Sequence, residues 1–349
     1  MRILHVISSL GIGGAERLIS DMLPQMKTAG MDVSLLVYRR LYNAFEKKLE
    51  DAGIAIISLE AKSNYSPRII FSLAIAMKEF DVIHVHLFPS LYQVAVANLI
   101  NQKKLIYTEH NTTNRRRNKW YLRRIEKRVY NRYYYIVSVS RETQDSLVKW
   151  LGEDDCRFTV INNGIDISLF DNLSASRDYP FTLLMVSRFA PAKDQETVVR
   201  AMQRLSDDTH VIFVGDGETR QSCVKLSIEL NVARRCHFVG NQENVPYWIS
   251  KADIGIQASH WEGFGLTAVE MMAGGLPVVA SDVEGLKQVV DGAGILFKDS
   301  DDKELATIID KLRKNKAHRT LVASQCVNRA SLYSIKKTAE CYMELYQSV

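Results

Sequence analysis

The sequence lacks most of the features that mark secreted, zinc-stabilised or membrane-spanning proteins. Only five of its 349 residues are cysteines, and these are scattered without CxxC spacing or an accompanying histidine cluster. That pattern predicts a reduced compartment and no structural zinc. The longest apolar runs, such as residues 69–77, are far shorter than the roughly 20 residues of a membrane helix. The apolar start at residues 3–7 has no signal-peptide features, so we expect a buried first strand in a cytoplasmic protein.

Several catalytic motifs are also missing. The sequence contains no lipase-type GxSxG, no HExxH and no phosphate-binding P-loop. Its one DxD segment, Asp299-Ser300-Asp301, precedes a helical pattern and is predicted to cap that helix rather than to chelate a metal. We therefore expect no cofactor and no required divalent cation.

The composition and the order of apolar segments predict a two-domain α/β protein. A chain of 349 residues with 46% hydrophobic and 24% charged residues is typical of a globular protein too long for one core. Short β-branched runs alternate with amphipathic segments of helical length, as in parallel sheets covered by helices. Strands are expected at residues 3–7, 33–38, 54–59, 82–86, 105–108, 136–139, 158–161, 182–186, 210–214, 237–239, 254–258, 277–280 and 295–297.

A polar stretch from Asn162 to Pro180 lacks periodicity and predicts the boundary between the two domains. We therefore expect domains at residues 1–165 and 166–334, with a cleft between them. Residues 335–349 are expected to form a terminal helix whose apolar stripe needs a surface to cover. That stripe consists of Ile335, Ala339, Tyr342, Met343 and Tyr346.

The strongest local signal is the segment EGFGLTAVE at residues 262–270, which follows a predicted strand and leads into a helix. Gly263 and Gly265 allow backbone amides to approach a ligand closely. The helix N-terminus adds unpaired N–H groups and a dipole that favours an anion such as diphosphate. Glu262 and Glu270 bracket this start, and Glu270 can accept two vicinal hydroxyls, as ribose requires. In isolation both carboxylates would be interpreted as solvated, but their position after a strand favours a ligand role.

A second signal is the segment VSRFAPAKD at residues 186–194, in which a strand ends, a loop carries two basic residues and a helix begins near Asp194. Arg188 and Lys193 can clamp phosphate oxygens at the ligand edge of an open α/β sheet. Such residues are usually only solvated when they occur alone. Together with the glycine-rich segment they predict a diphosphate site.

A glycine loop at residues 10–16 follows the first strand and opens a helix. Gly13 and Gly14 match a dinucleotide fingerprint only loosely, because Glu16 stands where a third glycine is expected. The next strand also lacks an acidic partner for ribose, so nicotinamide binding is not predicted.

Histidines occur at the ends of two adjacent predicted strands. His84 and His86 end one strand and His110 follows the next. Histidines in such positions are more often satisfied polar residues than catalysts. His110 lies at the carboxyl edge of its strand, however, so a direct ligand role for it stays open beside the structural one.

Residues 114–135 carry nine Arg or Lys residues against a single acid, Glu126. A helical projection places Leu122, Ile125 and Val129 on one apolar face, with most of the charge elsewhere. The segment can be a solvated helix, a surface for an anionic membrane, or a site for an acidic or diphosphate-linked acceptor. Without a nucleic-acid motif, no nucleic-acid partner is expected. The candidate acceptor or membrane residues are Arg116, Arg117, Lys119, Trp120, Arg123 and Arg124.

Taken together, these segments resemble the retaining glycosyltransferases of family 4, over essentially the whole chain. The specific features are the E-x7-E pair of Glu262 and Glu270 and its distance from the R-x4-K pair of Arg188 and Lys193. The glycine loop, the strand-end histidine and the NGID segment at 163–166 give further support. The resemblance implies a GT-B fold, in which two Rossmann-like domains face each other across a cleft and a C-terminal helix returns to the N-terminal domain.

The resemblance also implies a role for each candidate residue. Arg188 and Lys193 would hold the donor diphosphate, and Glu270 the ribose hydroxyls. Glu262 would bind a hydroxyl of the donor sugar, and His110 would lie beneath the anomeric carbon, completing a catalytic set with Arg188 and Lys193. The other donor contacts would come from Gly13, Gly14, Asn241, Val245, Gly263, Phe264, Gly265 and Leu266.

The implied activity is metal-independent transfer of a hexose from a nucleoside-diphosphate sugar, with retention of configuration. UDP is the favoured nucleotide and GDP the alternative. The expected acceptor is a glycan or lipid-linked molecule in cell-surface polysaccharide or lipopolysaccharide assembly, with peripheral contact to an anionic membrane. A GT-B sugar-nucleotide epimerase and a non-catalytic nucleotide-sugar or membrane adaptor are alternatives, and the sequence predicts no oligomeric state.

Overall fold

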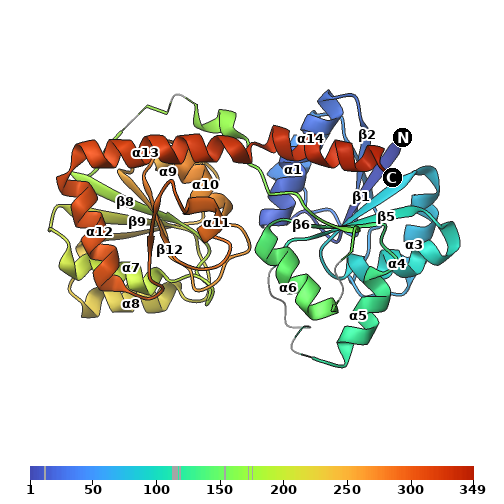
Figure 1. The fold of residues 1–349 in the computed structure, drawn as a ribbon, viewed down its shortest axis with the longest axis horizontal. Coiled ribbons are helices and arrows are strands. Elements are labelled where there is room, and N and C mark those ends of the chain that lie inside the picture. The colour runs from blue at the N-terminus through green and yellow to red at the C-terminus, as the bar shows by residue number, and fades with distance from the viewer. Residues whose placement is uncertain (12, 112–116, 118, 153–154, 172, 175) are drawn as a thin grey trace. The chain divides into compact units, whose positions relative to one another are not determined.

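The computed structural model describes residues 1–349 except 12, 112–116, 118, 153–154, 172 and 175 (Figure 1). The chain divides into two compact units. Unit 1 consists of residues 1–164 and 335–349, and unit 2 consists of residues 165–334. The C-terminal residues thus belong to the same unit as the N-terminal ones.

Unit 1 is built on a parallel sheet of seven strands in the order β3-β2-β1-β4-β5-β6-β7. The strands are β1 (Arg2–Ile7), β2 (Asp32–Val37), β3 (Ala55–Ser58), β4 (Val82–His86), β5 (Lys104–Glu109), β6 (Tyr135–Ser138) and β7 (Phe158–Val160). The helices of unit 1 include α1 (Gly14–Thr28), α2 (Ala44–Asp51), α3 (Arg68–Ala76), α4 (Ser90–Asn101), α5 (Leu122–Tyr130), α6 (Arg141–Leu151) and α14 (Ile335–Gln347).

Two separate cores lie on the two faces of this sheet, because successive side chains of a strand point to opposite faces. From β1, Leu4 and Val6 join the core that α3 and α4 cover, whereas Ile3 and Ile7 join the core under α1 and α14. Helix α14 packs against α1. Its buried residues include Ile335, Ala339, Tyr342 and Tyr346, which belong to the apolar stripe expected for a terminal helix.

Unit 2 repeats the arrangement with six parallel strands in the order β10-β9-β8-β11-β12-β13. The strands are β8 (Phe181–Val186), β9 (Thr209–Val214), β10 (Cys236–Gly240), β11 (Ile254–Gln257), β12 (Val278–Ser281) and β13 (Ile295–Phe297). The helices are α7 (Gln195–Ala201), α8 (Arg220–Glu229), α9 (Val245–Ser250), α10 (Leu266–Ala273), α11 (Lys287–Val290), α12 (Asp302–Lys314) and α13 (Lys316–Ala330).

Both sheets have the doubly wound order 3-2-1-4-5-6 of a Rossmann fold, which unit 1 extends by one strand. In such sheets the strand order reverses at a switch point, and ligands bind outside the carboxyl ends of the two strands beside it. The switch point lies between β1 and β4 in unit 1 and between β8 and β11 in unit 2. The prediction of two Rossmann-like domains is confirmed.

Helix starts agree with the capping residues in the sequence. Asp301 Oδ1 accepts from the backbone N–H groups of Lys303 and Glu304 and so caps α12, as predicted for the DxD segment. Asp194 likewise accepts from Thr197 N–H at the start of α7. Each cap satisfies backbone donors that a helix leaves unpaired in its first turn.

The buried face of helix α5 agrees only in part with the predicted one, because Val129 packs against the core but Ile125 does not. Ile125 is 48% exposed, whereas Glu126 is fully buried. The Glu126 carboxylate accepts hydrogen bonds from Tyr92 Oη at 2.7 Å and from Trp150 Nε1 at 2.6 Å. A helical projection assigns the faces by polarity alone and cannot anticipate that two donors make burial of a carboxylate acceptable.

Candidate active site

The basic loop after β8 and the loop after β11 lie side by side at the switch point of unit 2. Lys193 forms an antiparallel β-bridge with Ser259. Two further backbone bonds fasten the loops: Asp194 N–H donates to Ala258 C=O at 3.1 Å, and His260 N–H donates to Ala192 C=O at 2.9 Å. These bonds fix the position of the Lys193 side chain relative to the second loop.

Lys193 and Glu262 form an ion pair that joins the two loops. Both side chains are largely buried, at 17% and 19% exposure, so water screens the pair only in part. Ser259 Oγ lies 3.4 Å from Lys193 Nζ and 3.3 Å from Glu262 Oε2. The structure therefore brings together a cation and a carboxylate that are 69 residues apart in the sequence.

Arg188 is exposed at the carboxyl end of β8. Its backbone is held by Gln195, whose Nε2 donates to Ser187 Oγ at 3.0 Å and to Arg188 C=O at 3.2 Å. The following residue, Phe189, is buried against Phe213. The backbone at Arg188 is thus fixed while its side chain remains available to a ligand.

A second glycine loop, which the sequence analysis missed, supports the Arg188 loop. Gly215 and Gly217 follow β9 with φ of +134° and +148°, a region that favours glycine. A Cβ atom at Gly215 would lie 2.1 Å from Ser187 C=O, and one at Gly217 would lie 2.1 Å from Phe189 C=O. The GDG spacing after a strand was the signal available for this close backbone approach.

The glycine-rich segment at 262–270 forms a tight loop and then helix α10. Gly265 is the N-cap residue with φ of +85°, and a Cβ there would lie 2.5 Å from Leu286 Cδ2. Gly285, a position that the sequence analysis did not single out, packs below this loop, where a Cβ would lie 2.3 Å from Glu262 C=O. Phe264 is buried in the core of unit 2. The amino end of α10 is therefore held rigidly beside Glu262.

Glu270 is buried on α10, with only 1% exposure. The interpretation of this carboxylate as a solvated helix residue is therefore wrong. A carboxylate at the ligand edge of a sheet can accept hydrogen bonds from ligand hydroxyls. The last two donor candidates flank the end of β10: Asn241 is exposed, and Val245 is buried at the start of α9.

The candidate residues of unit 1 lie at the carboxyl edge of its own sheet. Gly13 is the N-cap residue of α1 and Gly14 is the first helical residue. A Cβ at Gly13 would lie 2.4 Å from Glu16 Oε2, so glycine leaves room for that carboxylate. Burial raises the pKa of Glu16 above its ordinary value.

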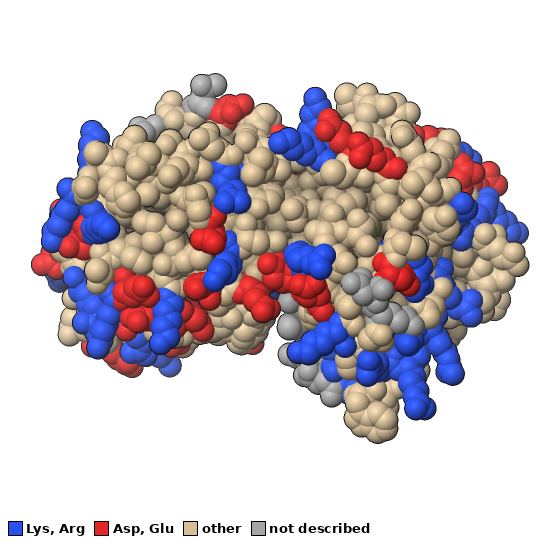
Figure 2. All heavy atoms as spheres, in the orientation of Figure 1, with Lys and Arg blue, Asp and Glu red and all other residues tan. Residues whose placement is uncertain are grey.

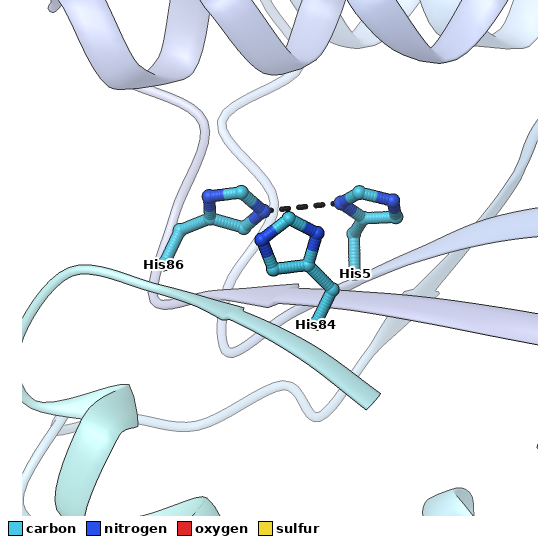
Figure 3. A group of neighbouring side chains, drawn as sticks. All are labelled: His5, His84 and His86. Atoms are coloured by element: carbon cyan, nitrogen blue, oxygen red, sulfur yellow. Dashed lines mark hydrogen bonds between the residues drawn. The ribbon is translucent and has the colours of Figure 1, made fainter. Parts of the chain in front are cut away.

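His110 follows β5 and belongs to a cluster of four histidines. Its Nε2 atom lies 3.1 Å from His86 Nδ1, and His86 Nε2 lies 3.0 Å from His5 Nδ1. Figure 3 shows that His5, His84 and His86 point to one side of the sheet. His84 and His86 are satisfied polar residues, as the sequence analysis favoured, because both ring nitrogens of each have partners.

Burial keeps these histidines neutral. It lowers the pKa of His5 to about 3 and that of His110 to about 3. Burial and the neighbouring imidazoles hold the pKa values of His84 and His86 well below the ordinary value. The edge of unit 1 therefore offers neutral hydrogen-bonding groups near pH 7, in contrast to the charged groups of unit 2.

Within the basic segment, Arg117 differs from its neighbours. Its side chain is only 9% exposed and forms an ion pair with buried Glu109, with Nη2 and Oε2 at 3.0 Å. Arg117 Nη1 also donates to Ser146 Oγ at 3.0 Å. The expectation that Arg117 presents its charge outward is therefore not met, because the buried carboxylate of Glu109 attracts it. Lys119, Trp120, Arg123 and Arg124 are exposed, and Arg116 lies outside the described residues.

Two groups of residues have the composition of metal-ligand sets. One is His5, His84 and His86, and the other is Asp194, His260 and Asp299; in each group the potential ligand atoms lie within 4.8 Å of one another. In the second, His260 Nδ1 lies 3.0 Å from Asp299 Oδ1 and links the DxD segment to the Lys193 loop.

The fold and the switch-point residues define a GT-B protein. HepE from Anabaena, solved with UDP and glucose, matches with a TM-score of 0.87 and 22% identity over 100% of both chains. Sucrose-phosphate synthase from Thermosynechococcus elongatus matches with a TM-score of 0.81 and 20% identity over 100% of this chain and 99% of that one. The WaaB lipopolysaccharide outer core galactosyltransferase matches with a TM-score of 0.74 and 16% identity over 100% of both chains.

Two family models together match most of the sequence. Residues 12–169 match Glycosyltransferase Family 4, and residues 169–326 match Glycosyl transferases group 1. The chain belongs to glycosyltransferase family 4. A D-inositol 3-phosphate glycosyltransferase of Thermomonospora curvata is 29% identical over 242 residues, which cover 60% of this chain and 56% of that relative. The match thus spans little more than half the length of this curated relative.

Proposed function

We propose that this protein is a retaining glycosyltransferase that transfers a hexose from a nucleoside-diphosphate sugar to a glycan or lipid-linked acceptor. The observation that carries the proposal is the meeting of Lys193 and Glu262 beside the amino end of α10 at the unit 2 switch point. Arg188 is exposed on the loop that Lys193 ends. A cation beside a helix N-terminus stabilises a diphosphate, and a carboxylate accepts from sugar hydroxyls.

The same residues account for the chemistry of the leaving group. As the bond from the anomeric carbon to the diphosphate breaks, negative charge grows on the leaving oxygen. Lys193, Arg188 and the first N–H groups of α10 would stabilise that charge, which is the electrostatic term that often dominates catalysis. Two basic side chains at this edge fit a reaction that needs no divalent ion. Retention, in which the acceptor attacks the face that the diphosphate leaves, rests on the resemblance of these motifs to family 4.

UDP is our preferred nucleotide and GDP the alternative. The preference is supported by HepE, a protein of similar fold that has been solved with UDP and with UDP-glucose. Cell-surface polysaccharide or lipopolysaccharide assembly is the proposed pathway class, and the WaaB galactosyltransferase is a fold neighbour that acts in the latter.

The acceptor proposal rests on the surface of unit 1. Among the described residues, no helix combines the length and apolar character needed to cross a membrane. Helices α3 and α4, which pack together, nevertheless expose several large apolar side chains to solvent. The exposed members are Phe71 (68%), Ile75 (68%), Val96 (46%), Leu99 (55%) and Ile100 (65%).

Positive charge lies next to this apolar surface. Arg123, Arg124 and Arg128 on α5 are exposed, and Figure 2 shows Lys and Arg gathered over the region of α5. Helix α5 contacts α4. Each basic residue near an anionic lipid surface adds about 1 kcal/mol, and buried apolar area adds about 25 cal/mol per Å². A peripheral docking surface for an anionic membrane that carries a lipid-linked acceptor would combine both contributions.

A thermal-shift panel with UDP-, GDP-, ADP- and dTDP-sugars tests the donor. A ligand that binds only the native state raises the melting temperature. We expect a selective shift with one nucleotide that is lost in Glu270→Ala and retained in Glu229→Ala, an exposed glutamate of unit 2. No shift with any donor would favour the adaptor function, and conversion of a donor sugar into its epimer without acceptor would favour the epimerase.

Liposome flotation tests the membrane surface. Phe71→Ser with Ile75→Ser, and separately Arg123→Glu with Arg124→Glu, are expected to abolish flotation on vesicles that contain anionic lipid. The matched controls lie in unit 2: Ile228→Ser with Leu321→Ser, and Lys311→Glu with Lys316→Glu, all at exposed positions. Equal loss in test and control variants, or no flotation of the wild type, would contradict the proposal.

A further inference from the structure

A chain of hydrogen bonds runs from β5 to α14 across the buried face of the unit 1 sheet. Its first part joins His110 Nε2 to His86 Nδ1 (3.1 Å) and His86 Nε2 to His5 Nδ1 (3.0 Å). Tyr346 Oη then bridges His5 Nε2 (3.3 Å) and His84 Nδ1 (2.5 Å). The last part joins His84 Nε2 to Thr108 Oγ1 (2.7 Å) and Thr108 Oγ1 to Tyr342 Oη (3.1 Å). Figure 3 shows the three central imidazoles, with the bond between His5 and His86.

These hydrogen bonds satisfy the ring nitrogens of the three buried histidines without a metal ion. All six ring nitrogens of His5, His84 and His86 take part in the chain. A cation would have to displace at least the bond between His5 and His86, and all three side chains are completely shielded from solvent. Satisfied buried imidazoles are therefore the better description of this cluster.

The chain also couples the protonation of its members. A neutral imidazole has one N–H donor and one acceptor nitrogen, and burial keeps these four rings neutral near pH 7. Each ring uses its Nδ1 atom on one side and its Nε2 atom on the other, so the bonds that join His110, His86 and His5 must run in one direction. The hydroxyls of Tyr346 and Thr108 satisfy both donor and acceptor when each accepts one of its bonds and donates the other, and the same direction then continues through His84. The four histidines must therefore share one tautomer, either all Nδ1–H or all Nε2–H.

The two ends of the chain decide between these directions. If all four histidines carry their proton on Nε2, the Tyr342 hydroxyl must donate to an atom outside this series of hydrogen bonds. Thr108 is, however, the only hydrogen-bond partner of Tyr342 Oη among the described residues. His110 Nδ1, which has no partner among them either, would then be a second unpaired atom. In the Nδ1–H direction Tyr342 donates to Thr108, and only His110 Nδ1 is left unpaired. Buried polar groups favour the arrangement with fewer unpaired atoms.

We propose that α14, through Tyr346 and Tyr342, holds His5, His84, His86 and His110 in the Nδ1–H tautomer, so that His110 offers an N–H donor at the carboxyl edge of the sheet. An oxygen atom of a bound substrate would accept this hydrogen bond. Tyr342 and Tyr346 act as positioning residues. Only the substrate contact of His110 rests on the proposed function, because the tautomers exist in the free protein.

Two matched variants on α14 separate positioning from packing. Tyr346→Phe removes the link between His5 and His84, so the segment from His5 to His110 loses its imposed direction. Tyr342→Phe makes the same chemical change at an equally buried position four residues away. It leaves Thr108 free to donate to His84, and the direction of the chain is unchanged. Thr108→Val is a second interruption, between Tyr342 and His84.

Nitrogen-15 NMR of histidine-labelled protein reads the tautomers directly, and four of the eight histidines lie in unit 1. We expect His5, His84, His86 and His110 as Nδ1–H in the wild type and in Tyr342→Phe. In Tyr346→Phe, we expect the Nε2–H form to appear at His110. Nε2–H signals in the wild type, identical spectra for both tyrosine variants, or stoichiometric zinc or nickel in the purified protein together with chelator-sensitive spectra would each overturn the proposal.

Kinetics supply an independent test with the donor found in the thermal-shift panel. We expect kcat/KM to fall about fivefold to tenfold in Tyr346→Phe, the effect of one misdirected hydrogen bond, and to fall less in Tyr342→Phe. Equal losses in the two variants would contradict the positioning role. If no donor is turned over, the proposed function fails while the NMR result still decides the tautomers.

Discussion

Units 1 and 2 share a doubly wound strand order but differ in the chemistry at their switch points. At the edge of unit 2, two basic side chains and one acidic side chain, Arg188, Lys193 and Glu262, are at least partly accessible. At the edge of unit 1, burial keeps His5 and His110 neutral. One backbone plan can thus support a site of charged side chains in one unit and a network of neutral histidines in the other.

The local support of the two edges differs in the same way. In unit 2, Gly215, Gly217 and Gly285 let backbone segments approach one another closely, which positions the charged loops. In unit 1, side chains from β1, β4, β5 and α14 hold one another through hydrogen bonds. The position of the unit 2 loops therefore depends on how closely their backbones pack, whereas the unit 1 edge depends on each polar side chain of its network.

The largest effect is expected when a basic side chain of the unit 2 site is removed. Lys193→Ala and Arg188→Ala are each expected to lower transition-state stabilisation by about 2 to 4 kcal/mol, because the leaving diphosphate loses a cation. Steady-state kcat/KM measures this loss. Lys225→Ala, at an exposed position on α8, is the control and is expected to behave as wild type. Wild-type turnover in either site variant would show that the site is assigned wrongly.

A smaller effect is expected from the buried carboxylate. Glu270→Gln keeps the shape of the side chain but removes its charge, so hydrogen bonds from donor hydroxyls weaken by about 1.5 to 3 kcal/mol. Calorimetric titration with the nucleotide donor should show a correspondingly higher Kd. The exposed residue Glu229 on α8 offers the matched change Glu229→Gln, which should leave Kd unchanged. Equal affinity for both variants would remove Glu270 from the donor site.

The neutral buried histidines of unit 1 predict that the stability of the protein depends on pH. The pKa of His5 is about 3 in the folded protein and about 6.5 in the unfolded chain, so the unfolded state binds more protons between these values. The contribution of neutral His5 to the free energy of unfolding is therefore fully present above pH 6.5 and is lost as the pH drops toward 3. Each such histidine adds about 1.4 kcal/mol per pH unit to the slope within that window.

Denaturant unfolding between pH 7 and 5 measures this slope with little interference from ordinary carboxylates. His5→Gln is expected to unfold at lower denaturant but with a shallower dependence on pH. A His5→Gln slope equal to that of the wild type would mean that this imidazole is not held neutral by folding.

The smallest predicted effect concerns unit 2 alone. Asp301→Ala removes the cap of α12 and is expected to cost about 1 kcal/mol. Differential scanning calorimetry would show a lower transition for unit 2, with that of unit 1 unchanged if the two units unfold separately. A shift of both transitions together would show that the units unfold as one.

Much of the fold and of the unit 2 site could be predicted from the sequence. The thirteen strands among the described residues overlap the thirteen expected ones, because a buried parallel strand is a short apolar run whatever its neighbours are. Asp301 was recognised as a cap, and a helix start was expected near Asp194, because capping depends on residues two or three positions away. Lys193 and Glu262 each stand next to a recognisable strand end.

Other features depended on partners that are distant in the sequence. Glu126 was noted only as the single acid of the basic segment, and its burial depends on Tyr92 and Trp150 from two other helices. Arg117 was grouped with exposed basic residues, although its partner Glu109 lies at the end of a buried strand. Polarity and spacing describe one segment at a time and do not include such contacts.

The sequence by itself determined the alternation of strands and helices, the charged loops and the amphipathic stripe of α14, because each depends on residues close together in the chain. Only the tertiary structure decided the neutral network of unit 1. His5 and Tyr346 meet across 341 positions, and His84 and Tyr346 across 262. Strand order and the docking of α14 bring these groups together, and burial then fixes their protonation because a charged imidazole would lose its hydration.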